Sequence, residues 1–477
     1  MVHSSSPPPC DHPDTLACMV SDQPAGDWLA PHATGPVRAL VRLPGSKSMT
    51  NRALILAALS DRPAWIYGPL VARDTQLMAG ALRALGCRIE ESRGAWRVEP
   101  AAYGRLDGGG PPTIDIDVGN AGTVLRFVPP VAALTSSDVR FAGDRRVSQR
   151  PVGPLLAALR ELGAAISDDG SGAVPFVVHG SGSVAGGSVT VDASSSSQLL
   201  SGLLLAAARF GSGAEIRHCG PPVPSAPHIE MTVRMLRSAG VHVTEELAQD
   251  GGHETVPDGC GGRSHGRSVT HAWQVSPGTV SAGVMRIEPD LSNAMPFLAA
   301  ALATGGEVTI ADWPAGSLQP AARIIELLRS MGAHVRLTAD GLRVTGSGQI
   351  SGVGADLTEV GELTPVLTAL AALARSPSEF TGIGHLRRHE SDRLAALSNE
   401  IGKLGGEVTE TADGLRIRPA PLRAAGVDFD SHDDHRMVMA GAVLGLVTSG
   451  LRVRNAAAVG KTFPEFARVW AEALVPA

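Results

Sequence analysis

The chain has 477 residues, 43% of them hydrophobic and 18% charged, and its formal net charge is −6. This length is sufficient for two or more domains, and the acidic balance argues against a nucleic-acid or anionic-membrane surface. No apolar run reaches the roughly 18 residues that a membrane-spanning helix needs, so we expect neither a nucleic-acid nor a membrane partner. The five cysteines are odd in number and form no CxxC pair, which predicts free thiols in a reducing, cytoplasmic compartment.

Residues 1–35 come before the first predicted element. They are rich in Pro, Ser, His and Asp, and they lack the apolar segment of a signal peptide. We interpret them as a disordered N-terminal tail.

Two helix patterns recur along the rest of the chain. One ends in a glycine that precedes a short strand, as a left-handed helix C-cap requires, at Gly86, Gly163, Gly240, Gly332 and Gly405. The other is an apolar helix that begins near residues 50, 121, 196, 291, 362 and 435. In both series the one long interval contains the polar, Gly-rich segment 249–270, which we interpret as a surface insertion. Without it the period is roughly 70 residues, too long for a solenoid, and predicts six copies of an α/β unit in two domains of three.

The predicted N-terminal ends of the apolar helices carry more polar groups than capping requires. Helix N-termini have free N–H groups and a positive potential, so they are suited to anions. Capping explains a single Ser or Asp at each end, but it does not explain Lys47 with Arg52, or the sequence Asp434-His435-Arg436. We therefore predict a site for polyanions at these ends.

Lys47 is one of only three lysines, although Lys and Arg together number 41, and Lys461 occupies a second polar loop. Their retention suggests that both positions require a compact ammonium group, since arginine serves almost everywhere else; the alternative is chance. The sequence RLPGSKS lacks the first glycine of GxxxxGK[ST], so Lys47 does not belong to a nucleotide-binding P-loop.

Two glutamates complete the candidate site. Glu362 and Glu390 have the chemistry to accept and donate protons, although each could equally be the partner of a structural ion pair with a nearby arginine. Cys260 and the histidines around it have irregular spacing, so we expect no metal site.

A series of ordered motifs carries a resemblance to a known family. They are LPGSKSMTNRALILAAL, GNAGTVLRF, QRPVGPLL, SSSQLLSGLLLAA, SAPHIEMT, EPDLSNA, HESDRLAAL, DHRMVMAGAVLGL and KTFPEF. From about residue 38 onward the chain resembles the 3-phosphoshikimate 1-carboxyvinyltransferase (EPSP synthase) family, and its actinobacterial branch most. The resemblance implies a mixed α/β fold: a two-domain inverted α/β prism of six βαβαββ repeats, three per domain, with the active site in the interdomain cleft. It implies domains at 45–287 and at 36–44 with 288–477.

The resemblance also implies the reaction. The enolpyruvyl group of phosphoenolpyruvate passes to the 5-hydroxyl of 3-phosphoshikimate through a tetrahedral ketal, and phosphate is released. This step belongs to the shikimate pathway of chorismate and aromatic amino acid biosynthesis, uses no cofactor or metal, and is the target of the inhibitor glyphosate. We expect a cytoplasmic monomer whose partners are its two small-molecule substrates.

The family's functional residues carry over position by position. Lys47 resembles a residue that contacts both substrates, Glu362 the proton acceptor, Glu390 the proton donor, and His435 a residue that polarises the reacting groups. The positions that resemble contacts to 3-phosphoshikimate are Lys47, Ser48, Arg52, Ser196, Ser197, Gln198, Ser225, Glu362 and His389. Those that resemble contacts to phosphoenolpyruvate are Lys47, Asn120, Gly122, Arg150, Gln198, Arg393, Arg436 and Lys461.

Three positions depart from the family's usual pattern. Glu362 replaces the common Asp, His389 replaces Lys, and His228 replaces Tyr; both histidines should weaken a substrate contact or make it pH-dependent.

Gly122 has no side chain and should leave room for glyphosate, so Gly122→Ala should lower inhibition more than activity.

Two other functions stay open. One is that of the UDP-N-acetylglucosamine enolpyruvyl transferases, but their reactive Cys would fall near Arg145, in a segment, DRRVSQRP, that has no Cys. The other is an inactive, anion-binding protein on the same scaffold, which the retention of both glutamates, His435 and both lysines disfavours.

Overall fold

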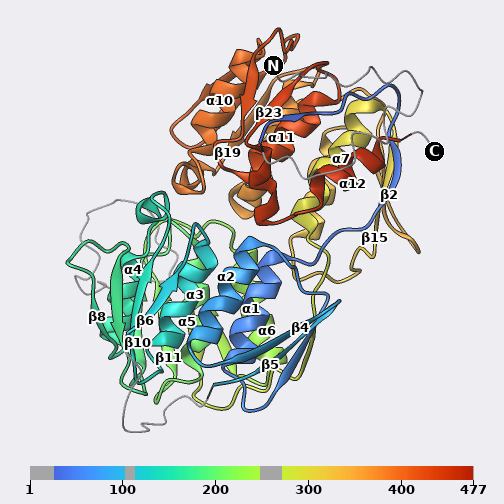
Figure 1. Cartoon of the computed structure of the whole chain (residues 1–477). Helices are drawn as coiled ribbons and strands as arrows, with labels where there is room; N and C mark the ends of the chain where they lie inside the picture. The colour runs from blue at the N-terminus through green and yellow to red at the C-terminus, as the bar shows by residue number, and fades with distance from the viewer. Residues whose placement is uncertain (1–25, 102–112, 248–270, 476–477) are drawn as a thin grey trace, which may run out of the picture.

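The computed structural model describes residues 26–101, 113–247 and 271–475, which form two bodies, one above the other in Figure 1. Each body has its own hydrophobic core. Residues between Met49 and Ala282 build the first core, and residues 30–41 and 291–473 build the second. The prediction of a mixed α/β fold is confirmed. The predicted insertion 249–270 lies outside the described residues.

The elements of the first body alternate between helices and strands. In chain order they are α1 (Lys47–Ala58), β3 (Ala64–Tyr67), α2 (Arg73–Ala84), β4 (Arg88–Ser92), β5 (Ala95–Glu99), β6 (Ile114–Asp117), α3 (Gly122–Ala132), β7 (Asp138–Ala142), η2 (Val147–Gln149), α4 (Gly153–Glu161), β8 (Ala165–Ser167), β9 (Phe176–His179), β10 (Gly187–Val191), α5 (Ser197–Ala207), β11 (Ala214–His218), α6 (Pro227–Ser238), β12 (Val243–Leu247), β13 (His271–Val275) and β14 (Val284–Arg286).

The second body has the same alternation. Its elements are β1 (Trp28–Leu29), β2 (Arg38–Val41), α7 (Leu291–Thr304), β15 (Glu307–Ala311), α8 (Ala321–Ser330), β16 (His334–Thr338), β17 (Gly341–Thr345), β18 (Gly354–Asp356), η3 (Thr358–Leu363), α9 (Thr364–Ala372), β19 (Ser378–Thr381), η4 (Gly384–Arg388), α10 (Arg393–Lys403), β20 (Glu407–Glu410), β21 (Leu415–Arg418), β22 (Asp428–Asp430), α11 (His435–Gly445), β23 (Arg452–Arg454), η5 (Ala456–Lys461) and α12 (Phe466–Ala473).

The sheets repeat one pattern of strand pairing. In five of the described sheets a parallel pair is followed by two antiparallel strands, as in the order β6-β7-β9-β8. In Figure 1 the strands lie on the outside of the lower body, around α1, α3 and α5. These helices are apolar on nearly all sides and almost fully buried, because sheets and neighbouring helices surround them.

The prediction of a disordered tail is wrong for residues 26–35. Strand β1 pairs antiparallel with β23, Ala30 is buried, and Nδ1 of His32 lies 3.3 Å from the carbonyl oxygen of Gly445. The last α/β unit therefore takes its antiparallel strand from the N-terminal side of the chain. The rest of the predicted tail, residues 1–25, lies outside the described residues.

Two findings bear on the expected environment of the protein. Cys219 is disulfide-bonded, so the prediction of free thiols is wrong for this residue. Within the described residues, no helix combines the length and the apolar character that crossing a membrane requires. Because of the disulfide bond, the cysteine pattern no longer supports a reducing compartment.

The two bodies exchange one strand each. Strand β2, which precedes α1, pairs with β15 of the second body, and β14, which precedes α7, pairs with β3 of the first. The chain thus crosses twice, at Gly45 and Pro289, which form a β-bridge. A Cβ atom on Gly45 would lie 2.1 Å from the carbonyl oxygen of Gly68, so only glycine fits this crossing. On this basis we propose domains at 45–287 and at 36–44 with 288–477, the second extended to include residues 26–35.

Candidate active site

One cavity between the two bodies collects most of the predicted site residues. Its predicted lining residues are Lys47, Ser48, Arg150, Ser196, Ser197, Gln198, Ser225, Glu362, His389, Glu390, Arg393, His435 and Arg436. Five polar residues that were not assigned to either substrate also line it: Ser46, Asp290, Ser292, Gln319 and His385. His228, noted as a departure from the family's pattern, lies in the same wall.

Four predicted residues lie outside this lining. Asn120 and Lys461 border an adjacent cavity, where the Lys461 ammonium donates to the carbonyl oxygen of Asn120 at 2.9 Å. Gly122 is the first residue of α3. Arg52 is buried behind the wall, and its guanidinium donates to Thr232 Oγ1 and to the carbonyl oxygens of Ser48 and His228.

Helix N-termini shape the cavity, as the sequence predicts. Ser46, Ser196, Asp290 and Asp434 are the N-caps of α1, α5, α7 and α11, and each accepts a hydrogen bond from a backbone N–H of its helix. Capping therefore accounts for these residues. It does not account for Lys47, Ser197 and His435, which directly follow three of the caps and line the cavity.

Asp290 connects the two bodies at this point. Its Oδ1 caps α7 by accepting from the Asn293 N–H at 3.1 Å, and its Oδ2 accepts from the Lys47 N–H of α1 at 3.1 Å. The first turns of α1 and α7 are therefore held side by side. Because Asp290 has the position of an ordinary N-cap, this second contact could not be predicted from the sequence.

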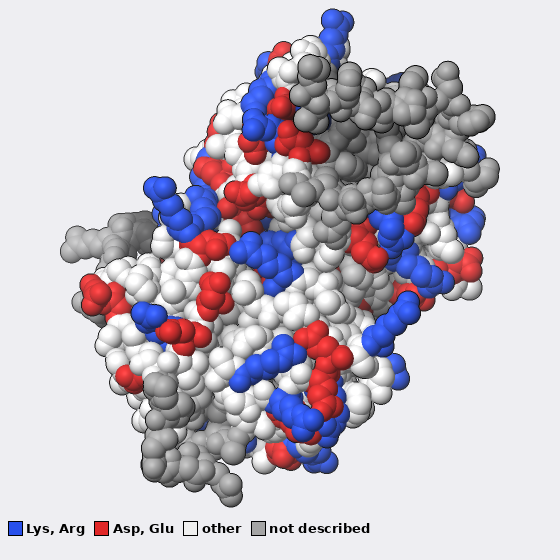
Figure 2. All heavy atoms as spheres, viewed as in Figure 1, with Lys and Arg blue, Asp and Glu red and all other residues white. Residues whose placement is uncertain are grey.

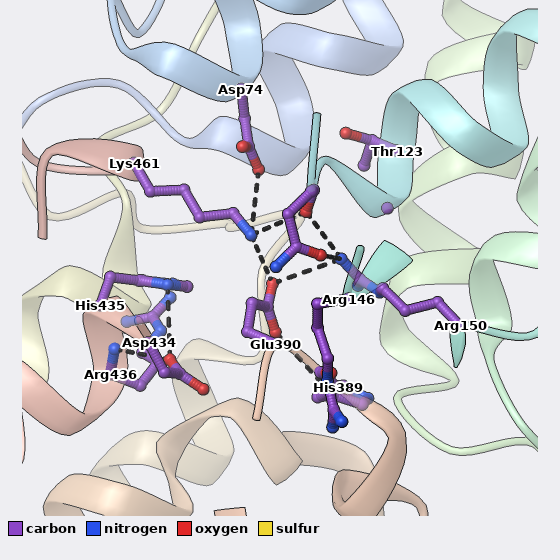
Figure 3. A network of polar contacts seen from close by, with 12 residues as sticks. Asp74, Thr123, Arg146, Arg150, His389, Glu390, Asp434, His435, Arg436 and Lys461 are labelled. Atoms are coloured by element: carbon purple, nitrogen blue, oxygen red, sulfur yellow. Dashed lines mark hydrogen bonds and ion pairs between the residues drawn. The ribbon is translucent and has the colours of Figure 1, made fainter. Parts of the chain in front are cut away.

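Lys47 and Lys461 share a buried carboxylate. Asp74, in the first turn of α2, lies 3.2 Å from the Lys47 ammonium. It also lies 4.0 Å from the Lys461 ammonium (Figure 3). Burial lowers the pKa of Lys47, and the negative charge of Asp74 partly offsets this effect. An acidic residue in the first turn of a helix is common, so the sequence did not distinguish Asp74 from a simple helix-dipole partner.

Glu390 lies among three cations (Figure 3). Its carboxylate is 3.0 Å from the Lys461 ammonium, 3.2 Å from the Arg393 guanidinium and 3.8 Å from that of Arg150. Burial alone would raise the pKa of Glu390, but these cations outweigh it and hold the pKa well below the usual range of a glutamate. Glu390 is therefore a carboxylate at neutral pH when the site holds no substrate.

Glu362 has the opposite environment. It lies in η3, just before α9, and accepts a hydrogen bond from Ser292 Oγ at 3.4 Å. Burial raises its pKa, and the charges of Arg436 and Arg393 offset only part of that effect. A carboxylate with a raised pKa is a stronger base, and this suits a group that accepts a proton.

The histidines of the cavity are neutral at physiological pH. Burial lowers the pKa of His228 to about 3 and that of His385 to about 4. Burial also lowers the pKa values of His389 and His435 far below the usual range, and nearby arginines add to the effect. His228 and His389 therefore do not titrate near neutral pH in the substrate-free protein, and the pH-dependent contacts that we expected do not arise there.

Gly122 packs against two guanidinium groups. A Cβ atom at this position would lie 2.5 Å from Nη2 of Arg150 and 2.8 Å from Nη1 of Arg126. Arg126 in turn donates to Gln198 Oε1 at 2.9 Å. A side chain at Gly122 would thus displace cations of the site as well as fill space in it.

These features are typical of one class of protein: an α/β enzyme with a cation-lined cavity between two bodies and two buried carboxyl groups in its wall. The family model for EPSP synthase (3-phosphoshikimate 1-carboxyvinyltransferase) matches residues 31–470, and the chain belongs to this family. As a member of it, the chain transfers the enolpyruvyl group of phosphoenolpyruvate to 3-phosphoshikimate, in the shikimate pathway of aromatic biosynthesis.

Solved structures share the fold. Two structures of EPSP synthase from Acinetobacter baumannii have TM-scores of 0.71 and 0.70 at 24% and 23% sequence identity. The enolpyruvyl transferase NikO from Streptomyces tendae has a TM-score of 0.68 at 16% identity. Each match covers 94% of this chain and 98% of the other chain. The two-domain prism that the motifs implied is therefore the fold of this chain.

Proposed function

We propose that the transfer takes place in the cavity between the two bodies, through a tetrahedral ketal and without a cofactor or metal. The observation that carries this proposal is the pair of buried carboxyl groups, Glu362 and Glu390, whose pKa values shift in opposite directions within one cation-lined cavity. Such a separation is typical of groups that accept and donate protons in one reaction.

The polar groups of the first body suit 3-phosphoshikimate. A phosphate accepts hydrogen bonds from hydroxyls and from helix N-termini, and the N-terminal ends of α1 and α5 supply both. We propose contacts from Lys47, Ser48, Ser196, Ser197, Gln198, Ser225, Glu362 and His389. Arg52 contributes its charge from behind the wall, since its donors already bind protein atoms.

The cations that surround Glu390 suit phosphoenolpyruvate, which carries a phosphate and a carboxylate. Guanidinium groups bind such anions with two parallel hydrogen bonds, and an ammonium adds a point charge. We propose contacts from Lys47, Asn120, Gly122, Arg150, Gln198, Arg393, Arg436 and Lys461. Lys47 lies where the two substrates would meet, which explains why a lysine is kept there.

The proton transfers follow from this arrangement. Glu362 accepts the proton of the 5-hydroxyl as its oxygen attacks the enolpyruvyl carbon, and Glu390 gives a proton to the methylene carbon. His435, neutral and at the N-terminus of α11, polarises the reacting groups. Glu390 needs a proton that it lacks in the free enzyme. We propose that phosphoenolpyruvate binds the cations around Glu390, which raises the pKa of Glu390 and lets it take up that proton.

We further propose a cytoplasmic monomer. The predicted site residues around the cavity come from both bodies of this chain, which supports a site that one copy can complete. The two phosphorylated substrates are too polar to cross a membrane unaided, which favours the compartment where they are made.

Phosphate release from purified protein tests the function. We expect turnover with both substrates in the presence of a chelator, and its loss in Lys47→Ala and Glu390→Gln. If phosphate were released with UDP-N-acetylglucosamine and not with 3-phosphoshikimate, the protein would have the function of the UDP-N-acetylglucosamine enolpyruvyl transferases instead. If both ligands bound and neither acceptor reacted, the scaffold would be serving as a binding protein.

A further inference from the structure

Arg146, in the loop between β7 and α4 of the first body, contacts the backbone of the second body (Figure 3). Nε of Arg146 lies 3.4 Å from the carbonyl oxygen of His389, and Nη2 lies 3.3 Å from that of Arg387. Its Nη1 donates to Gln149 Oε1 at 2.5 Å, which fixes the guanidinium against its own loop. Arg146 was not among the predicted site residues.

We propose that Arg146 is a positioning residue for Glu390, the proton donor of the proposed function. It does not reach the carboxylate, but it holds the backbone that carries it. His389 directly precedes Glu390 and adopts an extended conformation at the end of η4, where backbone carbonyls have lost their helical partners. A cation that binds two such carbonyls restricts the direction in which the next side chain leaves the backbone.

The same backbone is fixed from its other side by the second body. The Arg387 side chain bonds to Glu410 and donates to the carbonyl oxygen of Thr411 at 2.9 Å. The segment from Arg387 to Glu390 is thus held between Arg146 and the β20–β21 hairpin. The Arg146 contact crosses from the first body, so it forms only when the two bodies approach each other.

Two arginines of one loop therefore act on Glu390 in different ways. Arg150 approaches the carboxylate itself, at 3.8 Å, and lowers its pKa. Arg146 sets where that carboxylate lies. Because a misplacement of about 1 Å costs on the order of 100-fold in a positioned reaction, the second role is as consequential as the first.

Substitution by Met tests this inference, because Met keeps an apolar stem of similar length but has no donor. We expect Arg146→Met to lower kcat roughly 10- to 100-fold, as expected for two lost charged hydrogen bonds at a positioned group. The Kd for 3-phosphoshikimate alone should change by a smaller factor than kcat, since Arg146 contacts the carbonyl oxygen of His389 and not its side chain, and that complex does not use Glu390 as a donor. Arg146→Lys should recover part of kcat.

Arg145 offers a matched control. It is the exposed neighbour in the same loop, and among the described residues its side chain has no hydrogen bond or ion pair with the second body. Arg145→Met should leave kcat and both KM values within about twofold of the wild type.

A double-mutant cycle separates positioning of Glu390 from a general structural role. If Arg146 acts through Glu390, then Arg146→Met should lower the residual single-turnover rate of Glu390→Gln by less than about twofold. A full second loss would overturn the inference, and so would a wild-type kcat in Arg146→Met. The inference rests on the proposed function, whose own failure looks different: the wild type would then release no phosphate.

Discussion

At the scale of a single residue, the protonation state of Glu390 in the free enzyme is the opposite of the one that the proposed reaction needs. The proposed reaction needs its neutral acid, whereas Lys461, Arg150 and Arg393 favour its carboxylate. When an anion pairs with those cations, their effect on Glu390 weakens and burial dominates. The pKa of Glu390 should therefore rise on binding of phosphoenolpyruvate, and the enzyme should take up a proton.

Calorimetry measures this uptake directly. With a 5-deoxy analogue of 3-phosphoshikimate in the site, no transfer can occur, and phosphoenolpyruvate binding can be followed in buffers of different ionisation enthalpy. The uptake should grow as the pH falls from 8 to 6, because a larger fraction of Glu390 is then protonated in the complex, while Glu390 of the free enzyme stays ionised. Glu390→Gln should lack this component. An equal proton count in both proteins would contradict the proposal.

Gly122 gives a second prediction at this scale. In Gly122→Ala the new methyl group must displace the guanidinium groups of Arg150 and Arg126, so phosphoenolpyruvate binding should weaken as well as glyphosate binding. Glyphosate should lose more, because we expect it to occupy the space beside Gly122 that the methyl group would fill. We expect the inhibition constant to rise by a larger factor than the KM for phosphoenolpyruvate.

The control for this prediction is Gly80→Ala in α2, where a Cβ atom meets nothing within 4 Å. It should leave both constants unchanged and stabilise the helix by about 0.5–1 kcal/mol. Equal factors for inhibitor and substrate in Gly122→Ala would rule out the steric explanation.

At the scale of elements, the N-terminus of α11 depends on one buried ion pair. Asp434 caps the helix and binds the Arg393 guanidinium at 2.8 Å, with side chains 0% and 3% exposed. Asp434→Ala would leave the buried charge of Arg393 without this partner. We expect the free energy of unfolding, measured by urea denaturation, to fall by about 3–5 kcal/mol.

Asp392 provides the comparison, because it caps α10 and its side chain is 40% exposed. Asp392→Ala should cost only about 1 kcal/mol, the value of a lost cap. If both variants lost the same stability, the ion pair of Asp434 would contribute nothing beyond capping.

Elements also show what the sequence could and could not predict. The apolar helices were predictable because their composition is local: α5 begins at Ser197 and α11 at His435, next to the expected positions. Strand β1 was not, because its two residues pair with β23 at the opposite end of the chain. A pattern so short carries no periodicity, and its stability comes from a partner that only the fold supplies.

The same limit applied within the site. The predicted cations and serines were recognisable because their residue types are unusual at helix ends. Asp74 was missed, and the contact of Asp290 with Lys47 was not predicted, because each is a common residue at the start of a helix. Their roles arise only when α2 and α7 pack beside Lys47, and no local pattern records that neighbour.

At the scale of the whole molecule, charge is arranged unevenly. On the face in Figure 2 basic and acidic side chains alternate, with a group of Lys and Arg side chains between the two bodies. In the cleft, Lys47 and Arg150 come from the first body, and Arg393, Arg436 and Lys461 come from the second. The carboxylates of Asp74 and Glu390 offset part of the repulsion between these like charges of opposite bodies, and bound anions should offset more of it.

Substrate binding should therefore draw the bodies together. The structure has the cross-body contacts of a closed form, such as the hydrogen bond from the Ser225 N–H to the carbonyl oxygen of Thr358 at 2.7 Å. Without anions, repulsion across the cleft opposes these contacts, so we expect a more open average in the free enzyme.

Small-angle scattering should show a smaller radius of gyration with phosphoenolpyruvate and the 5-deoxy analogue of 3-phosphoshikimate than without ligand. When shikimate replaces that analogue, the radius of gyration should decrease less. Shikimate lacks the phosphate, so more of the repulsion between the bodies remains. An identical radius in all samples would show that the bodies are already fixed, and that excluding water from the ketal needs no closing motion.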